Sequence, residues 1–261
     1  MYMSFGGGVQ STALAMLALE GHPDLLRVTG GRVPEAYIFA DTGEEPRAVY
    51  DHLEKIKELI PLIIISPRVR LSEPARRGKP DMPIWVESSS GRAPLRRQCT
   101  KEWKVLPVLR AAKKYFKVNL RRKPPYPLVS QWMGVSFEQA QRVRESRDVW
   151  RHNAYPLVAM GWTRADCESY LLKRGIVAPK SACVFCPLRS NEEWKYLTQA
   201  ELKYAAEFED ALKLAWENKQ GYLSKLKSSP SLHRSGVPIR LKPFFKEGAS
   251  FNEECEGVCG V

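Results

Sequence analysis

Apolar residues along the 261-residue chain form two kinds of pattern, short continuous runs and helix-spaced repeats. Continuous apolar runs of about four to eight residues are typical of strands buried on both faces, whereas apolar residues at helical spacing indicate amphipathic helices. The strands predicted in this way cover residues 1–4, 35–40, 61–66 and 128–136. The predicted helices cover 10–21, 44–60, 101–116, 137–146, 163–175 and 191–221, with Ser136 and Thr163 as N-caps and a break near Thr198.

Strands that alternate with helices predict an α/β fold, a doubly wound parallel sheet followed by a mostly helical C-terminal region. We therefore expect an α/β domain over residues 1–160 and a helical region over 161–261, which becomes irregular from residue 222. Residues 67–98 are rich in Pro, Arg, Ser and Gly and are predicted to form a long basic loop inserted in the first domain.

Ligands in such sheets bind beyond the carboxyl ends of the strands. These ends are predicted at residues 4–11, 40–45, 134–136 and from residue 66 onward. The first of them reads "SFGGGVQS" and leads directly into a predicted helix. Glycines allow the backbone to wrap around an anion at the positive end of a helix, so the segment is interpreted as a phosphate-binding loop. It has no lysine and is neither a Walker A loop nor a G-x-G-x-x-G motif; a flexible turn is the alternative.

The charge of the chain favours anionic partners. The formal net charge is +12, and basic residues concentrate between residues 67 and 152. Such a charge attracts nucleic acid or phosphorylated small molecules, although a basic soluble surface is an alternative explanation. No run of about 18 or more apolar residues occurs, so a cytoplasmic protein without a membrane partner is expected.

The chain has six cysteines, and in a cytosolic chain of this length they are not expected to form a structural disulfide framework. Cys183 and Cys186 form a C-x-x-C pair, which favours metal, cluster or redox chemistry. Cys167 lies in a helical pattern and is interpreted as a small core residue. Cys255 and Cys259 occur in the tail "NEECEGVCGV".

Four motifs, in order, resemble one superfamily. "SFGGGVQS" looks like the PP-loop of adenine nucleotide α-hydrolase-like (HUP) proteins, in the form found in phosphoadenosine phosphosulfate (PAPS) reductase-like members. "FADTGEEP" is similar to their DTG segment, "CTKEWKVLPV" to their cysteine–lysine–proline stretch, and "CVFC" to the later C-x-x-C of cluster-bearing members. Gln10 stands where the PP-loop usually has Asp, and Thr100 replaces a second cysteine.

The resemblance implies a set of site residues. Those implied to bind an adenine nucleotide (ATP, or PAPS as substrate, with Mg²⁺) are Ser4, Gly6, Gly7, Gly8, Gln10, Ser11, Asp41, Thr42, Gly43, Arg142 and Arg147. Arg142 and Arg147 are suited to phosphate or sulfate because a guanidinium group can donate two parallel hydrogen bonds to an oxyanion. Lys104 is implied as a catalytic contact to a nucleotide or substrate anion. Asp41 could bind ribose, a metal or backbone amides.

Cys99, Cys183 and Cys186 match the family's cluster ligands, and three thiolates would leave one iron of a 4Fe–4S cluster open. A zinc site completed by Cys255 or Cys259, and free thiols, are the alternatives. Cys255 is also a candidate nucleophile, because Glu254-Cys255 partly resembles the ending of PAPS reductases.

Three functions follow from the resemblance. The first is an ATP-dependent, iron–sulfur-dependent sulfurtransferase that modifies a nucleic acid (tRNA or DNA) with sulfur from a donor. The second is a PAPS or adenylyl sulfate reductase that uses Cys255 and thioredoxin. The third is a nucleotide- or nucleic-acid-binding module without catalysis.

Overall fold

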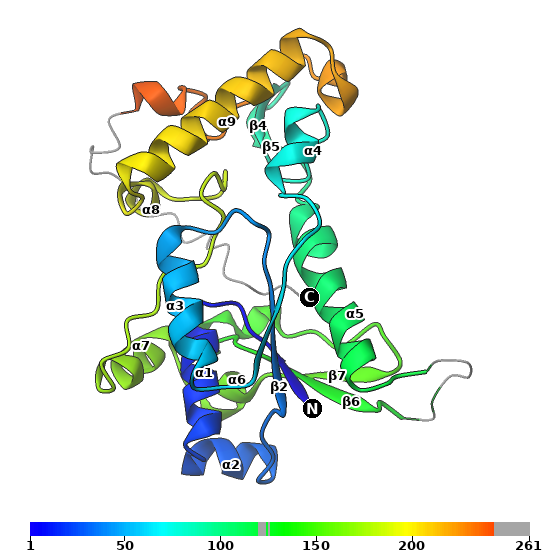
Figure 1. Ribbon diagram of the computed structural model, residues 1–261, viewed down its shortest axis with the longest axis vertical. Coiled ribbons are helices and arrows are strands. Elements are labelled where there is room, and N and C mark those ends of the chain that lie inside the picture. The colour runs from blue at the N-terminus through cyan, green and yellow to red at the C-terminus, as the bar shows by residue number, and fades with distance from the viewer. Residues whose placement is uncertain (120–123, 125, 243–261) are drawn as a thin grey trace.

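Five short strands form one parallel sheet in the order β3-β2-β1-β6-β7 (Figure 1). The structure is a computed structural model that describes residues 1–119, 124 and 126–242. The strands of the sheet are β1 (Tyr2–Ser4), β2 (Ala36–Ala40), β3 (Leu62–Ile65), β6 (Val129–Met133) and β7 (Arg151–Ala154). Tyr2 of β1 is in register with Ala36 on one side and with Gln131 on the other, so β1 lies at the centre. The predicted parallel α/β sheet is confirmed.

Helices cover both faces of this sheet, as expected for a doubly wound fold. One face packs on α1 (Val9–Leu19), α3 (Arg47–Lys57) and α7 (Arg164–Leu172), whose apolar side chains share a core with Met3 and Phe39. The other face packs on α5 (Leu106–Tyr115), which buries Val108 and Ala112 against Tyr2 and Ile38. Two short helices, α2 (Pro23–Thr29) and α6 (Pro156–Met160), complete this part of the molecule, here called the sheet lobe.

A second hydrophobic core lies outside the sheet. It joins Leu71 and Ile84 to Phe185, Phe208 and other side chains from the last third of the described chain. We call this part, residues 71–103 and 182–242, the cysteine lobe; Figure 1 shows α4, α9 and the β4–β5 hairpin at the opposite end of the molecule from α2. Its elements are α4 (Ser72–Arg76), β4 (Trp85–Ser88), β5 (Gly91–Pro94), the π-helix η1 (Thr100–Val105), α8 (Asn191–Lys195), α9 (Gln199–Glu217), and the 3₁₀ helices η3 (Gly221–Lys225) and η4 (Ile239–Leu241). The remaining 3₁₀ helix, η2 (Phe137–Arg142), follows β6.

The structure divides the chain differently from the boundary drawn at residue 160. Helix α7 packs along α1, and its Cys167, Tyr170 and Leu171 belong to the core of the sheet lobe. The stretch 67–98 is not simply a loop: it contains α4 and the β4–β5 hairpin and belongs to the cysteine lobe. An insertion in the first half of the chain and the C-terminal region therefore build one core together.

Helix boundaries follow the predicted caps closely. Thr163 and Thr198 are N-caps whose hydroxyls accept hydrogen bonds from Asp166 N and Glu201 N, and the predicted break at Thr198 separates α8 from α9. Ser136 precedes η2, but its hydroxyl donates to the Glu138 carboxylate and makes no cap bond. No helix within residues 1–119 or 126–242 is long and apolar enough to cross a membrane.

Candidate functional site

The glycine-rich turn lies where the winding of the sheet reverses. From β1 the chain continues to β2 and β3 on one side, and it later places β6 and β7 on the other. In sheets of this kind the crevice at the carboxyl ends of the two diverging strands is the usual ligand site. Here that crevice lies between the turn after β1, residues 5–8, and the end of β6 at Gly134.

Two glycines make this crevice possible. Gly7 has a φ of +75°, a conformation that other residues rarely adopt, and a Cβ there would lie 3.3 Å from the Phe39 ring. A Cβ on Gly134 would lie 2.9 Å from Ser11 N, because the end of β6 runs directly against the start of α1. At Gly134 the backbone segments at the end of β6 and the start of α1 are therefore too close together for a residue with a side chain.

The predicted anion site lies at the start of α1. Gly8 is the N-cap residue, and the Ser11 hydroxyl accepts a hydrogen bond from Gly8 N (3.1 Å) and donates one to Gly8 O (3.0 Å). The first turn of α1 contains no acidic residue, so nothing offsets the positive end of the helix dipole. A cavity of about 30 Å³ adjoins this turn, and five of the residues implied to bind a nucleotide line it: Ser4, Gly6, Gly8, Gln10 and Ser11.

Two cations that the sequence did not single out complete the cavity, Arg164 from the start of α7 and Lys180. Arg164 Nε is 2.8 Å from Glu168, and Lys180 Nζ is 3.1 Å from Glu193. In this arrangement the cavity has room for one or two waters.

The turn after β2 connects the two lobes. Asp41 Oδ1 accepts hydrogen bonds from Gly43 N (2.7 Å) and from the Tyr50 hydroxyl (2.9 Å). Of the roles considered for Asp41, the structure shows the binding of a backbone amide. Gly43 follows with a φ of +74° and packs against Arg70.

The acidic residues of this turn are buried. Glu44 is 2% exposed, and its carboxylate accepts hydrogen bonds from Ser72 N (3.2 Å) and the Tyr204 hydroxyl (2.8 Å). The Glu44 carbonyl accepts from Val184 N (2.8 Å), so the turn also holds the C-x-x-C segment.

Three cysteines line one small pocket of the cysteine lobe. Cys99, Cys183 and Cys186 surround a cavity of about 20 Å³ together with Thr42 and Lys104. The Thr42 hydroxyl lies 3.3 Å from Cys183 Sγ, which joins the turn after β2 to the thiols. The structure thus brings together the three cysteines that the motifs singled out, although Cys99 precedes the other two by at least 84 positions in the sequence.

Lys104 lies between the thiols and the glycine turn. It lines the cysteine pocket, and it also lines a neighbouring cavity with Ser4 and Gly6. Its Nζ is 3.4 Å from Glu45 Oε1, and the Glu45 side chain is fully buried. Glu45 Oε2 has no hydrogen-bond partner among the described residues, and Oε1 accepts only a long hydrogen bond from the Thr42 hydroxyl (3.5 Å), so this carboxylate depends mainly on Lys104 for charge compensation.

The environment favours the thiol form of Cys183. Burial raises the pKa of Cys183, and the Glu45 carboxylate raises it further. Lys104 and the Thr42 hydroxyl lower this pKa, by less than burial raises it. Binding of a metal or a cluster requires deprotonation of this thiol.

Three cysteines are suitable ligands for a thiophilic metal, but their arrangement is not a preformed metal site. Within the described part of the chain, no three His, Cys, Asp or Glu residues are grouped so that they could hold a metal ion. Cys255, the predicted nucleophile or fourth ligand, lies outside the described residues, as does Cys259. The cluster, the zinc alternative and Mg²⁺ remain predictions, and no step below passes through them.

The predicted contacts from Arg142 and Arg147 are not brought to the glycine turn. Neither arginine lines the cavities around Gly6, Lys104 or the cysteines. Arg142 ends η2, where its Nη1 donates to Gln139 (3.2 Å), and Arg147 is exposed on the loop that follows.

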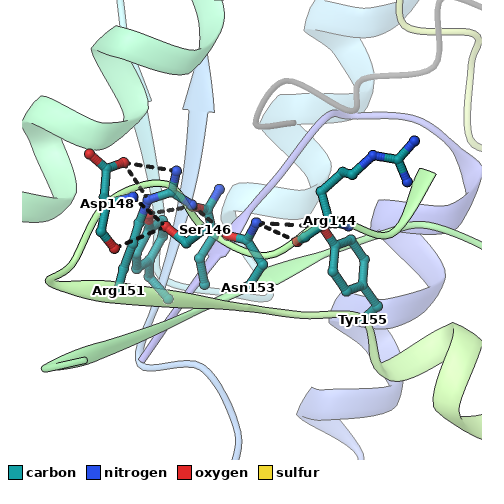
Figure 2. A network of polar contacts seen from close by, with 8 residues as sticks. Arg144, Ser146, Asp148, Arg151, Asn153 and Tyr155 are labelled. Carbon is teal, nitrogen blue, oxygen red and sulfur yellow. Dashed lines mark hydrogen bonds and ion pairs between the residues drawn. The ribbon is translucent and has the colours of Figure 1, made fainter. Parts of the chain in front are cut away.

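A polar network fixes that loop instead. Figure 2 shows the Tyr155 hydroxyl donating to the Arg144 carbonyl (2.8 Å) and Asn153 Nδ2 donating to the same oxygen (3.0 Å). Arg151, which is 5% exposed, donates to Asp148 (3.0 Å) and to Gln131 of β6 (2.6 Å). The network therefore ties the basic loop to β6 and β7 and away from the glycine turn.

Comparison with solved structures found chains of similar structure. The structure is similar to the crystal structure of phosphoadenylyl-sulfate (PAPS) reductase from Candida auris in a phosphate complex, with 17% sequence identity and a TM-score of 0.41, over 68% of this chain and 73% of that one. That reductase belongs to the family that the sequence motifs resemble. Comparisons with family models and with curated proteins gave no match. The α/β fold itself is established by the parallel sheet and its order.

Proposed function

We propose that the protein is a PP-loop enzyme that activates its target with an adenine nucleotide and transfers sulfur to it, the target being a nucleic acid. The observation that carries the proposal is the position of Lys104, which lines both a cavity beside Ser4 and Gly6 and the pocket of the three cysteines. A phosphate site and a thiol pocket that share one cation suit a reaction in which a phosphorylated intermediate meets a sulfur nucleophile.

In the first step ATP occupies the glycine turn. The N–H groups at the start of α1, with Arg164 and Lys180, bind the polyphosphate, and Mg²⁺, if bound with it, would neutralise part of its charge. An oxygen of the target attacks the α-phosphorus, the bond to the bridging oxygen breaks, and pyrophosphate leaves. Lys104 stabilises the charge that develops on the phosphoryl oxygens.

In the second step a sulfur nucleophile replaces the activated oxygen. One cysteine thiolate of the pocket, Cys186, takes the outer sulfur of a persulfide donor, and the donor leaves as a thiolate. The resulting Cys186 persulfide attacks the activated carbon, and AMP leaves with the oxygen. A second thiolate, from Cys99 or Cys183, then attacks Cys186 Sγ and releases the thiolated target, and an external dithiol reduces the cysteine disulfide that forms. A 4Fe–4S cluster bound by the same cysteines would hold sulfide at this place. The chain's own contribution is to keep the thiols dry and close to Lys104.

Nucleotide activation is tested with Lys180→Met. The purified protein is incubated with ATP, Mg²⁺ and nucleic acid, and ATP binding and pyrophosphate release are measured. We expect Lys180→Met to weaken ATP binding about tenfold, because a charge-assisted hydrogen bond contributes about 1.5–3 kcal/mol. Lys195→Met is the matched control, since Lys195 pairs with Glu192 (2.7 Å) much as Lys180 pairs with Glu193 but does not line the cavity. Equal losses in both variants would contradict the nucleotide site.

Sulfur transfer is tested with Cys186→Ser. This variant should still release pyrophosphate but should incorporate no sulfur into the nucleic acid. Cys167→Ala is the control, because Cys167 lies in the sheet-lobe core. Iron and sulfide are assayed after anaerobic purification of both variants. Release of sulfite from PAPS with thioredoxin, without pyrophosphate release from ATP, would replace this proposal with the reductase reaction.

A further inference from the structure

A groove of about 970 Å³ takes no part in the site described above. It lies between β3, an edge strand of the sheet, and helix α5. The chain that follows β3, residues 66–69, forms one side. The groove reaches Asp41 at one end, so it opens beside the turn that contacts Cys183.

The walls of the groove are largely apolar. Ile63 and Ile65 of β3 face Ala111 of α5 across it. Two aromatic side chains mark its ends, Trp103 just before α5 and Tyr115 at the end of the helix. Twelve residues separate these aromatics, about 18 Å along a helix, which matches roughly five stacked nucleotides of one strand.

The rim of the groove carries three cations without partners. Arg68, Arg110 and Lys114 are exposed, and none of their side chains makes a hydrogen bond or ion pair with another residue of the described chain. Arg110 and Lys114 are four residues apart on α5 and therefore lie on the same side of the helix. Because the three cations lie along one groove and are not engaged by acidic side chains, they are available to an external anion.

The acidic groups of the groove are already engaged. Asp41 accepts from Gly43 N and Tyr50, and Asp81 Oδ2 accepts from Trp103 Nε1 at 2.8 Å. Glu102 lies 3.8 Å from Lys101. The free charge presented to a ligand is therefore positive.

We propose that this groove binds a single-stranded segment of nucleic acid, with bases against Trp103, Tyr115 and the isoleucines and phosphates on Arg68, Arg110 and Lys114. Sequence-tolerant binding of single strands combines such aromatic platforms with a positively charged track. Three separate cations match repeated phosphates better than the phosphates of one small nucleotide, which cluster at one end. In a duplex the base faces are stacked and could not reach the aromatics.

This inference deepens the proposed function. Binding of the strand stands by itself, whereas the modification of the bound strand rests on the proposed sulfur transfer. Trp103 adjoins Lys104 in the sequence, and Asp41 adjoins Thr42, so the inner end of the groove borders the cysteine pocket. A strand in the groove would present a base at its inner end to the site where sulfur is transferred.

The test is fluorescence anisotropy with the full chain and labelled single-stranded RNA and DNA of about 12 nucleotides, within the site sizes of single-strand binders. No ATP is added, so the result is independent of the nucleotide and thiol chemistry. The double variant Arg110→Gln/Lys114→Gln should lower affinity at least tenfold. It should also reduce the slope of log K against log salt by about 1.4, because each lost phosphate contact reduces this slope by about 0.7. Tyr115→Ala should lower affinity about tenfold with no change in that slope.

Lys225→Gln/Lys227→Gln is the matched control, since both lysines are exposed in the cysteine lobe, away from the groove lining, and their removal changes the net charge equally. If the groove variant fails to fold, Arg68→Gln on the loop after β3 replaces it, with half the expected change in slope. The proposal is overturned if wild-type protein does not bind the single strand at low salt, or if the groove variants bind as the control does. It is also overturned if a duplex of the same sequence, or AMP, competes as well as the single strand.

Discussion

The buried ion pair between Lys104 and Glu45 gives a quantitative test of the site. Lys104→Met leaves the Glu45 carboxylate fully buried, with its nearest cation removed. Loss of one partner of a buried pair costs about 3–5 kcal/mol, and the 13% exposure of Lys104 places the expected loss near the lower end, about 3 kcal/mol. Glu45→Gln/Lys104→Met removes both charges and should recover about 1–2 kcal/mol of that loss.

The free energy of unfolding is measured by urea titration followed by tryptophan fluorescence, with both single variants and the double variant. The control is the pair of Lys57 and Glu54, which are 3.7 Å apart and 56% and 69% exposed. Such surface pairs contribute less than about 0.5 kcal/mol. A coupling energy for Lys104 and Glu45 no larger than that of the control would refute the interpretation that Glu45 depends on Lys104.

Three further predictions concern stability. Gly134→Ala places a methyl group 2.9 Å from Ser11 N, so we expect a loss of about 1–3 kcal/mol and weaker ATP binding; an unchanged melting temperature would contradict the close approach of the two backbones. Burial lowers the pKa of His52 and of His233 to about 4 from 6.5, so the unfolded chain binds protons first as the pH falls. Stability should therefore be complete above about pH 6.5 and fall toward pH 4 by up to about 3 kcal/mol per histidine, and a flat urea-unfolding profile over this range would exclude the effect. Thr198→Ala removes the N-cap of α9 and should cost about 1 kcal/mol, measured by urea unfolding; a loss below about 0.3 kcal/mol would show that the cap contributes little.

Local physical chemistry explains why much of the fold could be predicted from the sequence. The apolar runs at β2 and β3 need burial on both faces, and helix spacing with a threonine cap is enough to begin α7 and α9. The glycine turn was predictable because its conformation depends on the residues within it, above all Gly7. The motifs also paired Cys99 with the C-x-x-C segment, and the structure places the three in one pocket.

Elements held by distant partners escaped prediction. Strand β7 has a polar sequence, so no apolar run marks it as a strand. Its Arg151 is nevertheless buried, because it bonds to Gln131 and Asp148. The β4–β5 hairpin lies in a basic stretch, and an isolated bridge from Trp85 to Ser231 adds a partner 146 residues away.

The sequence by itself determined the alternation of strands and helices, the glycine-rich turn before α1 and the candidate thiols, because each depends on near neighbours in the chain. Only the tertiary structure decided that residues 71–103 share a core with the C-terminal region, that Arg164 and Lys180 reach the glycine turn, and that Arg142 and Arg147 do not line it. Each of these features depends on which segments, far apart in the sequence, come into contact in the folded chain. These contacts depend on the summed burial of both cores, which no local pattern encodes.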